Sequence, residues 1–334
     1  MPAACGGGCE GTPVTTLVLG MDVGGTSSRA VVTDLTGRVV GRGVGGGGNP
    51  ISRGIGPAMA SIRSAIEEAL RGVDGVAVDR NSVQGNVIGA AGFGAGTAHD
   101  ALAQVWRELG MPGEPVVAGD IEVSFASGTD ELDGSVLIGG TGAVAGSIAA
   151  GRPGPVADGL GWLLGDHGSG YWVGREAVRR ALSPRADLAD PLFGEVAVRL
   201  TGRGDVDRLT FIAAAYAAEP VRLSELAGVV VAAADAGSPV AQAILSAAAD
   251  ELVATLAQVR DAGETTVVVL GGGLLGTSRL RGLVTERVDG AWPGSPVRHT
   301  GSGVGGAAWL AARSLGVDLP EGLHATLTSP DTAH

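Results

Sequence analysis

The sequence predicts an α/β protein made of two similar lobes with a ligand cleft between them. Short apolar strands alternate with amphipathic helices along the chain, which is typical of an α/β fold. The length of 334 residues exceeds the roughly 100 to 200 residues of one domain. A pattern of apolar strand, Gly-Gly-Thr turn and apolar strand occurs at 17–34 and again at 135–150. Such a repeat indicates an internal duplication, and the junction of paired lobes is a common ligand site.

The first half opens with three predicted strands. The strands at 14–23 and 28–34 are joined by the first Gly-Gly-Thr turn, and a third follows at 37–46. Apolar residues then recur every three or four positions over 55–70, which predicts an amphipathic helix that ends at Gly72. The other predicted elements are a strand at 85–94, a helix at 97–109 with Thr97 as cap and Gly110 as stop, and a strand at 115–119.

The second half repeats the opening pattern and then becomes mainly helical. Two strands flank the turn within 135–150, and a later strand at 265–270 runs into a glycine-rich turn. Helices are expected at 168–183, 205–219, 222–236, 304–316 and 238–261, the last with Ser238 as cap and Pro239 as its first residue. We expect a first lobe at 14–119 completed by the helix at 304–316, a second lobe at 120–303, and a tail at 317–334.

The composition is that of a globular protein, because hydrophobic residues make up 45% and charged residues 17% of the chain. A net charge of -12 disfavours duplex nucleic acid and anionic membranes as partners, since either needs a basic surface. The chain has no run of about 18 uncharged apolar residues and no secretory pattern at its N-terminus, so we expect a cytoplasmic protein. Cys5 and Cys9 are too sparse for a disulfide framework or metal site, and we expect 1–13 to be a disordered tail.

The first Gly-Gly-Thr turn has the composition of an anion-binding loop. Gly24 and Gly25 leave backbone N–H groups unobstructed, and the hydroxyl of Thr26 adds a donor. Asp22 would repel a phosphate there unless a divalent cation lay between them, which is how carboxylates usually meet ATP. A tight hairpin that needs glycine for positive φ is the alternative for one such turn. The second turn, Gly140, Thr141 and Gly142, favours the phosphate interpretation.

A third glycine-rich turn follows the strand at 265–270. The segment 271–276 fits the GxGxxG pattern of dinucleotide-binding folds, but too little chain follows it to build such a fold. We therefore interpret Gly271, Gly272 and Gly273 as a turn against which a flat base or ribose can lie. The chain has no GxxxxGK[ST] motif, which excludes a P-loop nucleotide site.

Two further groups of polar residues are candidates for substrate chemistry. Asp120 follows a predicted strand and begins a helix, so it is either a base that accepts the proton of an attacking hydroxyl or a helix cap. Asp158, Asp166 and His167 lie in a segment rich in glycine and aromatic residues, where Trp162 can form an apolar wall for a sugar ring. A glycine-rich loop followed by a capped helix is the alternative for this segment.

Five motifs together resemble a known family. They are DVGGT at 22–26, AGD at 118–120, IGGTGAV at 138–144, GWLLGDHGSGYWVG at 161–174 and LGGGLLGTS at 270–278. In order and spacing they resemble the N-acetylglucosamine kinase branch of the BadF/BadG/BcrA/BcrD-type ATPase family, which belongs to the sugar kinase, heat-shock chaperone and actin superfamily. The resemblance covers residues 14–316 and implies two ribonuclease-H-like lobes of the actin-like ATPase type that close on ATP and a sugar.

The resemblance also implies roles for individual residues. Asp22 would hold Mg²⁺, Asp120 would be the catalytic base toward the sugar 6-hydroxyl, and Asn49 and Asp166 would bind sugar hydroxyls. The two phosphate loops would be Gly24, Gly25, Thr26 and Gly140, Thr141, Gly142, and the adenosine loop Gly271, Gly272, Gly273. The implied activity is ATP-dependent phosphorylation of N-acetylglucosamine by a homodimer. Glucosamine phosphorylation and an ATPase that acts on a partner protein are the alternatives.

The chain departs from the family pattern at two positions. His167 stands where the family often has glutamate, and Leu160 stands where it often has tryptophan. The cysteines that hold an iron–sulfur cluster in the dehydratase-activator branch are absent from the core, which favours the kinase branch.

Overall fold

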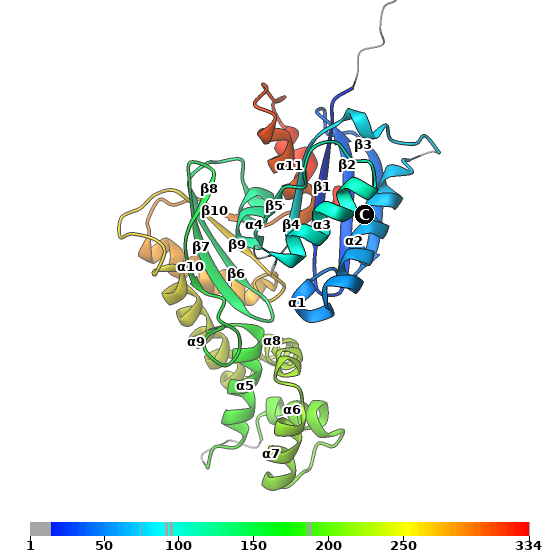
Figure 1. Cartoon of the computed structure of the whole chain (residues 1–334). Coiled ribbons are helices and arrows are strands. Elements are labelled where there is room, and N and C mark those ends of the chain that lie inside the picture. Colours follow the sequence, from blue (N-terminus) through cyan, green and yellow to red (C-terminus); the bar gives the residue numbers. More distant parts are fainter. Residues whose placement is uncertain are drawn as a thin grey trace, which may run out of the picture. The chain divides into compact units, whose positions relative to one another are not determined.

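The computed structural model describes residues 15–333, apart from positions 74, 91, 92, 94, 95, 185, 187 and 188. The expected tail at 1–13, with Cys5 and Cys9, lies outside these residues. The protein is a mixed α/β chain with two five-stranded sheets (Figure 1). It divides into two compact units, one running to Val123 and resuming at Gly301, the other spanning Ser124–Thr300. We expected a division at 119/120, whereas Asp120 falls in the first unit.

The sheet of the first unit has the strand order β3-β2-β1-β4-β5. The first three strands are antiparallel neighbours, and β4 and β5 run parallel to β1. The carboxyl ends of β1, β4 and β5 therefore lie at one edge. The strand bounds are β1 Leu17–Val23, β2 Ser27–Asp34, β3 Val39–Gly46, β4 Val83–Ala90 and β5 Val117–Ala118.

Helices cover both faces of this sheet. α2 (Ile55–Leu70) packs on β2 and β3, and α11 (Gly303–Ser314) packs on β1 and β4 (Figure 1). Gly20 allows close packing of α11, because a Cβ there would lie 2.3 Å from the backbone nitrogen of Ala308. The other helices are α1 Pro50–Arg53, η1 Arg80–Ser82, α3 Thr97–Glu108, α4 Asp120–Gly128, α12 Leu323–Thr328 and α13 Pro330–Ala333. Gly96, rather than Thr97, occupies the cap position of α3.

Gly20→Ala is expected to lower the free energy of unfolding by about 1 to 3 kcal/mol, because the added methyl group forces the backbone of α11 away from the sheet. Chemical denaturation measures this difference. Gly56→Ala is the matched control, since a Cβ there meets no atom within 4 Å and alanine favours the helix. Equal stability of the two variants would show that α11 does not need the close contact.

The segment 317–333, which we expected to be a tail, forms α12 and α13. Leu323 and Leu327 are buried, and the backbone N–H of Ser302 donates to the carbonyl oxygen of Thr328 at 2.9 Å. The two leucines are four residues apart, so they lie on one face of α12 and pack against the start of α11. This spacing is too short a signal to separate a single-turn helix from a loop.

The sheet of the second unit repeats the plan of the first. Its strand order is β10-β9-β6-β7-β8, with β6, β7 and β8 antiparallel and β9 and β10 parallel to β6. β8 was not expected. Pro153 and Pro155 lie within it, which an edge strand tolerates. The strand bounds are β6 Gly134–Gly139, β7 Ala143–Ala149, β8 Arg152–Asp158, β9 Val267–Gly271 and β10 Val297–His299.

The helices of the second unit form a large apolar core with this sheet. α9 begins at Pro239 with Ser238 as its cap, as the sequence predicts, and it buries Ile244, Leu245 and Leu252. α6 and α10 were not expected. The helix bounds are α5 Gly170–Ala181, α6 Pro191–Thr201, α7 Arg208–Ala217, η2 Pro220–Glu225, α8 Leu226–Asp235, α9 Pro239–Leu256 and α10 Ser278–Ala291.

Among the described helices, none is by itself long and apolar enough to span a membrane. One bent pair, 221–235 with 239–256, meets that requirement by length and composition alone.

Candidate active site

A pocket of about 320 Å³ in the second unit is lined by residues of two predicted loops, the second Gly-Gly-Thr turn and the glycine-rich turn after β9. Gly140 and Thr141 follow β6, and Gly273 follows β9, which runs parallel to β6. Residues of η2 and α8 complete the lining. The helix at 222–236 was expected, but no motif indicated that its residues line a site. The pocket has small, apolar and hydroxyl groups and no charged residue, which suits a flat base and ribose. The lining residues are Gly140, Thr141, Gly170, Ser224, Ala227, Gly228, Val231, Gly273, Leu274 and Thr277.

The three glycines at 271–273 differ in what they do for the fold. A Cβ at Gly271 would lie 2.5 Å from Thr300 Cγ2, and one at Gly272, where φ is +94°, would lie 2.5 Å from the carbonyl oxygen of Gly139. Both are therefore required by packing. A Cβ at Gly273 meets no atom within 4 Å, so this glycine leaves open space in the pocket.

The second Gly-Gly-Thr turn is held by the start of α5. The N–H of Gly170 donates to the carbonyl oxygen of Gly140 at 2.8 Å, and that of Tyr171 donates to the carbonyl oxygen of Thr141 at 3.1 Å. Neither Gly140 nor Gly142 has a positive φ. The hairpin alternative, in which glycine is needed for its dihedral angles, therefore does not explain this turn.

Asp166 lies against the same turn. Its Oδ1 accepts a hydrogen bond from the N–H of Ala143 at 3.0 Å, and a Cβ at Gly142 would lie 2.7 Å from that oxygen. Burial raises the pKa of the Asp166 carboxyl, and the negative charge of Asp158 adds to this, while the bond from Ala143 opposes it. Asp166 thus holds the second Gly-Gly-Thr turn in place, and its expected contact with sugar hydroxyls stays a prediction.

The loop between β8 and α5 carries the predicted aromatic wall. Trp162 is 44% exposed, and its ring centroid lies 5.8 Å from that of Tyr171. Leu160, Leu163 and Leu164 are also exposed. The loop therefore offers an apolar surface, on which the flat face of a sugar ring can pack.

In the first unit, Asp22 is a partly buried carboxylate near the end of β1. It lies against the N-terminus of α11, because a Cβ at Gly303 would be 2.6 Å from Asp22 Oδ2. Burial raises the pKa of Asp22, and the nearby Arg29 partly offsets this. Among the described residues, no group of three or more His, Cys, Asp or Glu side chains could hold a metal. Magnesium commonly takes one or two carboxylates with water and substrate phosphates, so the single carboxylate fits that ion.

The first Gly-Gly-Thr turn is exposed. Gly24, Gly25 and Thr26 all face solvent, and the N–H of Gly24 donates to the carbonyl oxygen of Ser27 at 2.9 Å. Arg53, which no motif indicated, donates from Nε to the carbonyl oxygen of Gly25 at 3.1 Å. Asn49 caps α1 by accepting from the N–H of Ile51 at 2.9 Å, and its sugar contact stays a prediction.

Asp120 stands at the same edge of the first sheet as Asp22, because it follows β5 and β5 runs in the direction of β1. Its side chain is exposed, and Oδ1 accepts from the N–H of Ile121 at 3.0 Å. The carboxylate of Glu122 accepts from the N–H of Gly119 at 2.9 Å. Glu122 therefore also stabilises the start of α4. Asp120 is an exposed carboxylate at the carboxyl edge of a sheet, which suits a base.

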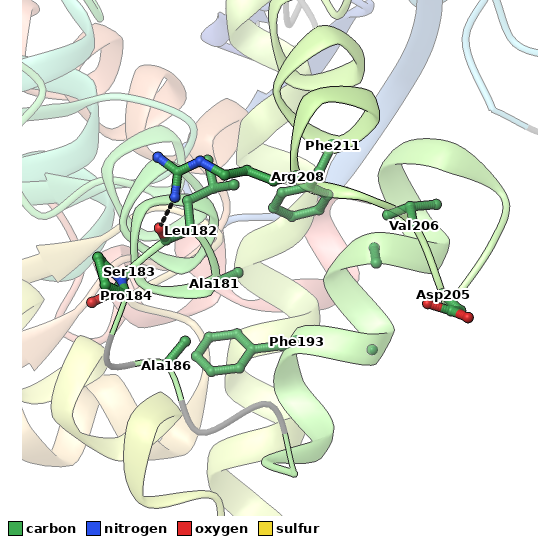
Figure 2. Close-up of a pocket in the computed structure, with 13 residues that line it drawn as sticks. Ala181, Leu182, Ser183, Pro184, Ala186, Phe193, Asp205, Val206, Arg208 and Phe211 are labelled. Atoms are coloured by element: carbon green, nitrogen blue, oxygen red, sulfur yellow. Dashed lines mark hydrogen bonds between the residues drawn. The ribbon is translucent and has the colours of Figure 1, made fainter.

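A larger cavity, of about 440 Å³, lies between the end of α5, α6 and α7 in the second unit (Figure 2). Phe193 and Phe211 line it, and Arg208 Nη1 donates to the carbonyl oxygen of Leu182 at 2.8 Å. None of the predicted site residues lines this cavity.

Two curated relatives are amino-sugar kinases by name. The N-acetylmuramic acid/N-acetylglucosamine kinase of Clostridium acetobutylicum is 36% identical over 99 residues, which is 28% of this chain and 31% of that protein. The N-acetyl-D-glucosamine kinase of Dictyostelium discoideum is 30% identical over 178 residues, 51% of this chain and 55% of that protein. The chain thus spans about a third and about half of the lengths of these relatives.

Solved structures show the same fold. A proposed N-acetylglucosamine kinase from Chromobacterium violaceum superposes with a TM-score of 0.68 at 24% identity, covering 90% of this chain and 100% of that one. A ROK family glucokinase from Streptomyces griseus, in complex with glucose and AMPPNP, superposes with a TM-score of 0.58 at 21% identity, covering 89% and 99%. These superpositions confirm the predicted two-sheet α/β fold, which this chain shares with both structures. The family model for the BadF/BadG/BcrA/BcrD ATPases matches residues 19–311, and the chain therefore belongs to that family.

Proposed function

We propose that this protein is an ATP- and Mg²⁺-dependent kinase that transfers a phosphoryl group to the 6-hydroxyl of N-acetylglucosamine. The observation that supports this most directly is the pocket that joins Gly140 and Thr141 to Gly273. A phosphate-binding turn beside an uncharged pocket is the arrangement that a nucleoside triphosphate requires. The names of the curated relatives favour an amino sugar as acceptor.

In this proposal each residue has the role that the sequence predicts for it. The pocket beside Gly273 takes the adenosine, and backbone N–H groups with the hydroxyls of Thr26 and Thr141 take the phosphates. Asp22 holds the cation, which when bound neutralises charge on the phosphates. Asp120 accepts the proton of the 6-hydroxyl. Phosphoryl transfer needs little further chemistry from the protein, because it depends on positioning and charge neutralisation.

The sugar is proposed to lie against Trp162, with Asn49 and Asp166 near its hydroxyls. Glucosamine is the alternative substrate, since it differs from N-acetylglucosamine by the acetyl group alone. The homodimer is a separate prediction, which light scattering coupled to size-exclusion chromatography would test.

A sugar panel tests the proposed function. ADP release from Mg-ATP would be measured with N-acetylglucosamine, glucosamine, glucose, N-acetylmannosamine and no sugar, and the product would be identified by phosphorus NMR. We expect the fastest release with N-acetylglucosamine and a 6-phosphate product. Release at the same rate without sugar would contradict a kinase and favour an ATPase that acts on a partner protein.

Gly273→Val is expected to raise the KM for ATP by about tenfold or more, because the isopropyl group fills space that the proposed adenosine occupies. The KM for the sugar and the thermal midpoint should stay unchanged, since a Cβ at Gly273 meets no protein atom within 4 Å. Steady-state kinetics at varied ATP measure this effect. Gly290→Val on α10, which also has no atom within 4 Å and does not line the pocket, is the control.

A further inference from the structure

In the loop between β8 and α5, the carboxylate of Asp158 joins the two ends of the loop, and the proposed reaction does not use it. Asp158 Oδ1 accepts from the N–H of Asp166 at 2.6 Å, and Oδ2 accepts from the N–H of His167 at 3.0 Å. The ring Nδ1 of His167 also lies 3.4 Å from Oδ2. The Asp158 side chain is only 5% exposed. The carboxylate therefore joins the first residues of the loop to its last.

The backbone at both ends of this loop is strained. Asp158 has φ +62° and Asp166 has φ +59°, in the left-handed region that residues other than glycine rarely adopt. Such conformations persist only where surrounding contacts determine them. Gly165 provides the necessary space, because a Cβ there would lie 2.1 Å from Asp158 Oδ1.

The loop exposes side chains that water would otherwise drive inward. Leu160 is 63% exposed, Leu163 is 73% exposed and Leu164 is 71% exposed. Because apolar side chains gain free energy on burial, an untethered loop of this composition would collapse onto the nearest surface. The hydrogen bonds from the N–H groups of Asp166 and His167 to Asp158 oppose this collapse.

Both ends of the loop are bonded to the residue that follows the phosphate turn. The N–H of Gly159 donates to the carbonyl oxygen of Ala143 at 2.9 Å, and the N–H of Ala143 donates to Asp166 Oδ1 at 3.0 Å. Burial alone would raise the pKa of Asp158, but the bonds from Asp166, His167 and Leu160 outweigh it and hold the pKa below its ordinary value. Asp158 therefore stays ionised near neutral pH.

From these contacts we propose that Asp158 is a positioning residue, which locks the loop 159–165 and Asp166 to the turn Gly140–Gly142 so that the loop and the phosphate turn form one rigid unit. This inference rests on the proposed function for its consequence, which is that losing the lock weakens nucleotide binding. The lock itself is a property of the ligand-free chain.

Two variants of the full chain test the lock. Asp158→Gly removes the carboxylate but relieves the backbone strain, and Asp158→Asn keeps the shape but turns a donor toward backbone N–H groups. In both, hydrogen exchange at the amides of Asp166 and His167 should become about tenfold faster or more. The Kd for ADP, measured by calorimetry, should rise by about tenfold if the competent turn becomes a tenth populated.

Ala150→Gly is the matched control, because Ala150 also has a positive φ, +50°, and lies in the hairpin between β7 and β8. It should leave exchange in the loop and the Kd for ADP unchanged. The thermal midpoint of Asp158→Gly should also stay unchanged, which separates a positioning role from a general loss of stability.

If the amides of Asp166 and His167 exchange in Asp158→Gly at the same rate as in the wild type, the inference is overturned. Asp158 would then only tolerate its backbone conformation. A loss of ADP affinity that follows a lowered thermal midpoint would overturn it as well. If the wild-type protein binds no ADP, the proposed function fails instead, and the exchange rates still decide whether the lock exists.

Discussion

Asp120→Asn is expected to lower sugar-dependent turnover on the order of 10² to 10⁴-fold while leaving the Kd for ADP nearly unchanged. The amide keeps an oxygen that can accept from the N–H of Ile121, so the start of α4 should persist. It cannot take the proton of an attacking hydroxyl. Steady-state kinetics give the turnover, and calorimetry with ADP gives the affinity.

The comparison variant for this experiment is Asp100→Asn. Asp100 is an exposed aspartate in the first turn of α3, so its replacement removes the same charge from the same unit without touching the sheet edge. It should have near-normal kinetics. Near-normal turnover in Asp120→Asn would reject Asp120 as the base.

Asp22→Asn is expected to lower Mg²⁺-dependent turnover by about a hundredfold or more, because the proposed cation loses the carboxylate that is proposed to hold it. The same change should stabilise the ligand-free protein at neutral pH. Burial raises the pKa of Asp22, which means that its ionised form is costly in the folded state. Turnover across a magnesium titration measures the first effect, and chemical denaturation without ligand measures the second.

The direction of this pKa shift also fixes a pH dependence. A cation binds the ionised carboxylate, so magnesium affinity should fall as the pH drops through the raised pKa of Asp22. The ligand-free protein should respond in the opposite sense, since protonation relieves the cost of burying the charge. Turnover with an unchanged magnesium requirement would contradict the assignment of Asp22 to the metal. Lower stability of ligand-free Asp22→Asn would contradict the cost of burying the Asp22 charge.

The repeated sheets could be predicted because their strands have strong local signals. Each begins with an apolar strand, a Gly-Gly-Thr turn and a second apolar strand, and this pattern depends on neighbouring residues alone. α6 could also have been found, because Asp190 followed by Pro191 is a typical helix start, with the carboxylate accepting from the N–H of Leu192. β8 could not, since its two prolines indicate a loop and only the edge position makes them acceptable.

The candidate site was predictable at its turns but not at its walls. Thr141 and Gly273 are in motifs, whereas Ser224 and Val231 line the pocket because η2 and α8 pack beside the turns. That packing joins residues far apart in the chain and has no local signature. The role of Asp158 could not be predicted for a similar reason. It depends on a left-handed backbone angle, which the residue type does not indicate except at glycine.

The matching sheets make one difference between the units informative. The second unit has Leu137, fully buried, at the position before its turn that corresponds to Asp22 in the first. At this position the first sheet carries an ionisable side chain, and the second sheet carries an apolar one that belongs to its core. Asp22 can therefore offer a carboxylate to a cation beside the first turn, whereas the matching position of the second turn serves only the interior of its own sheet.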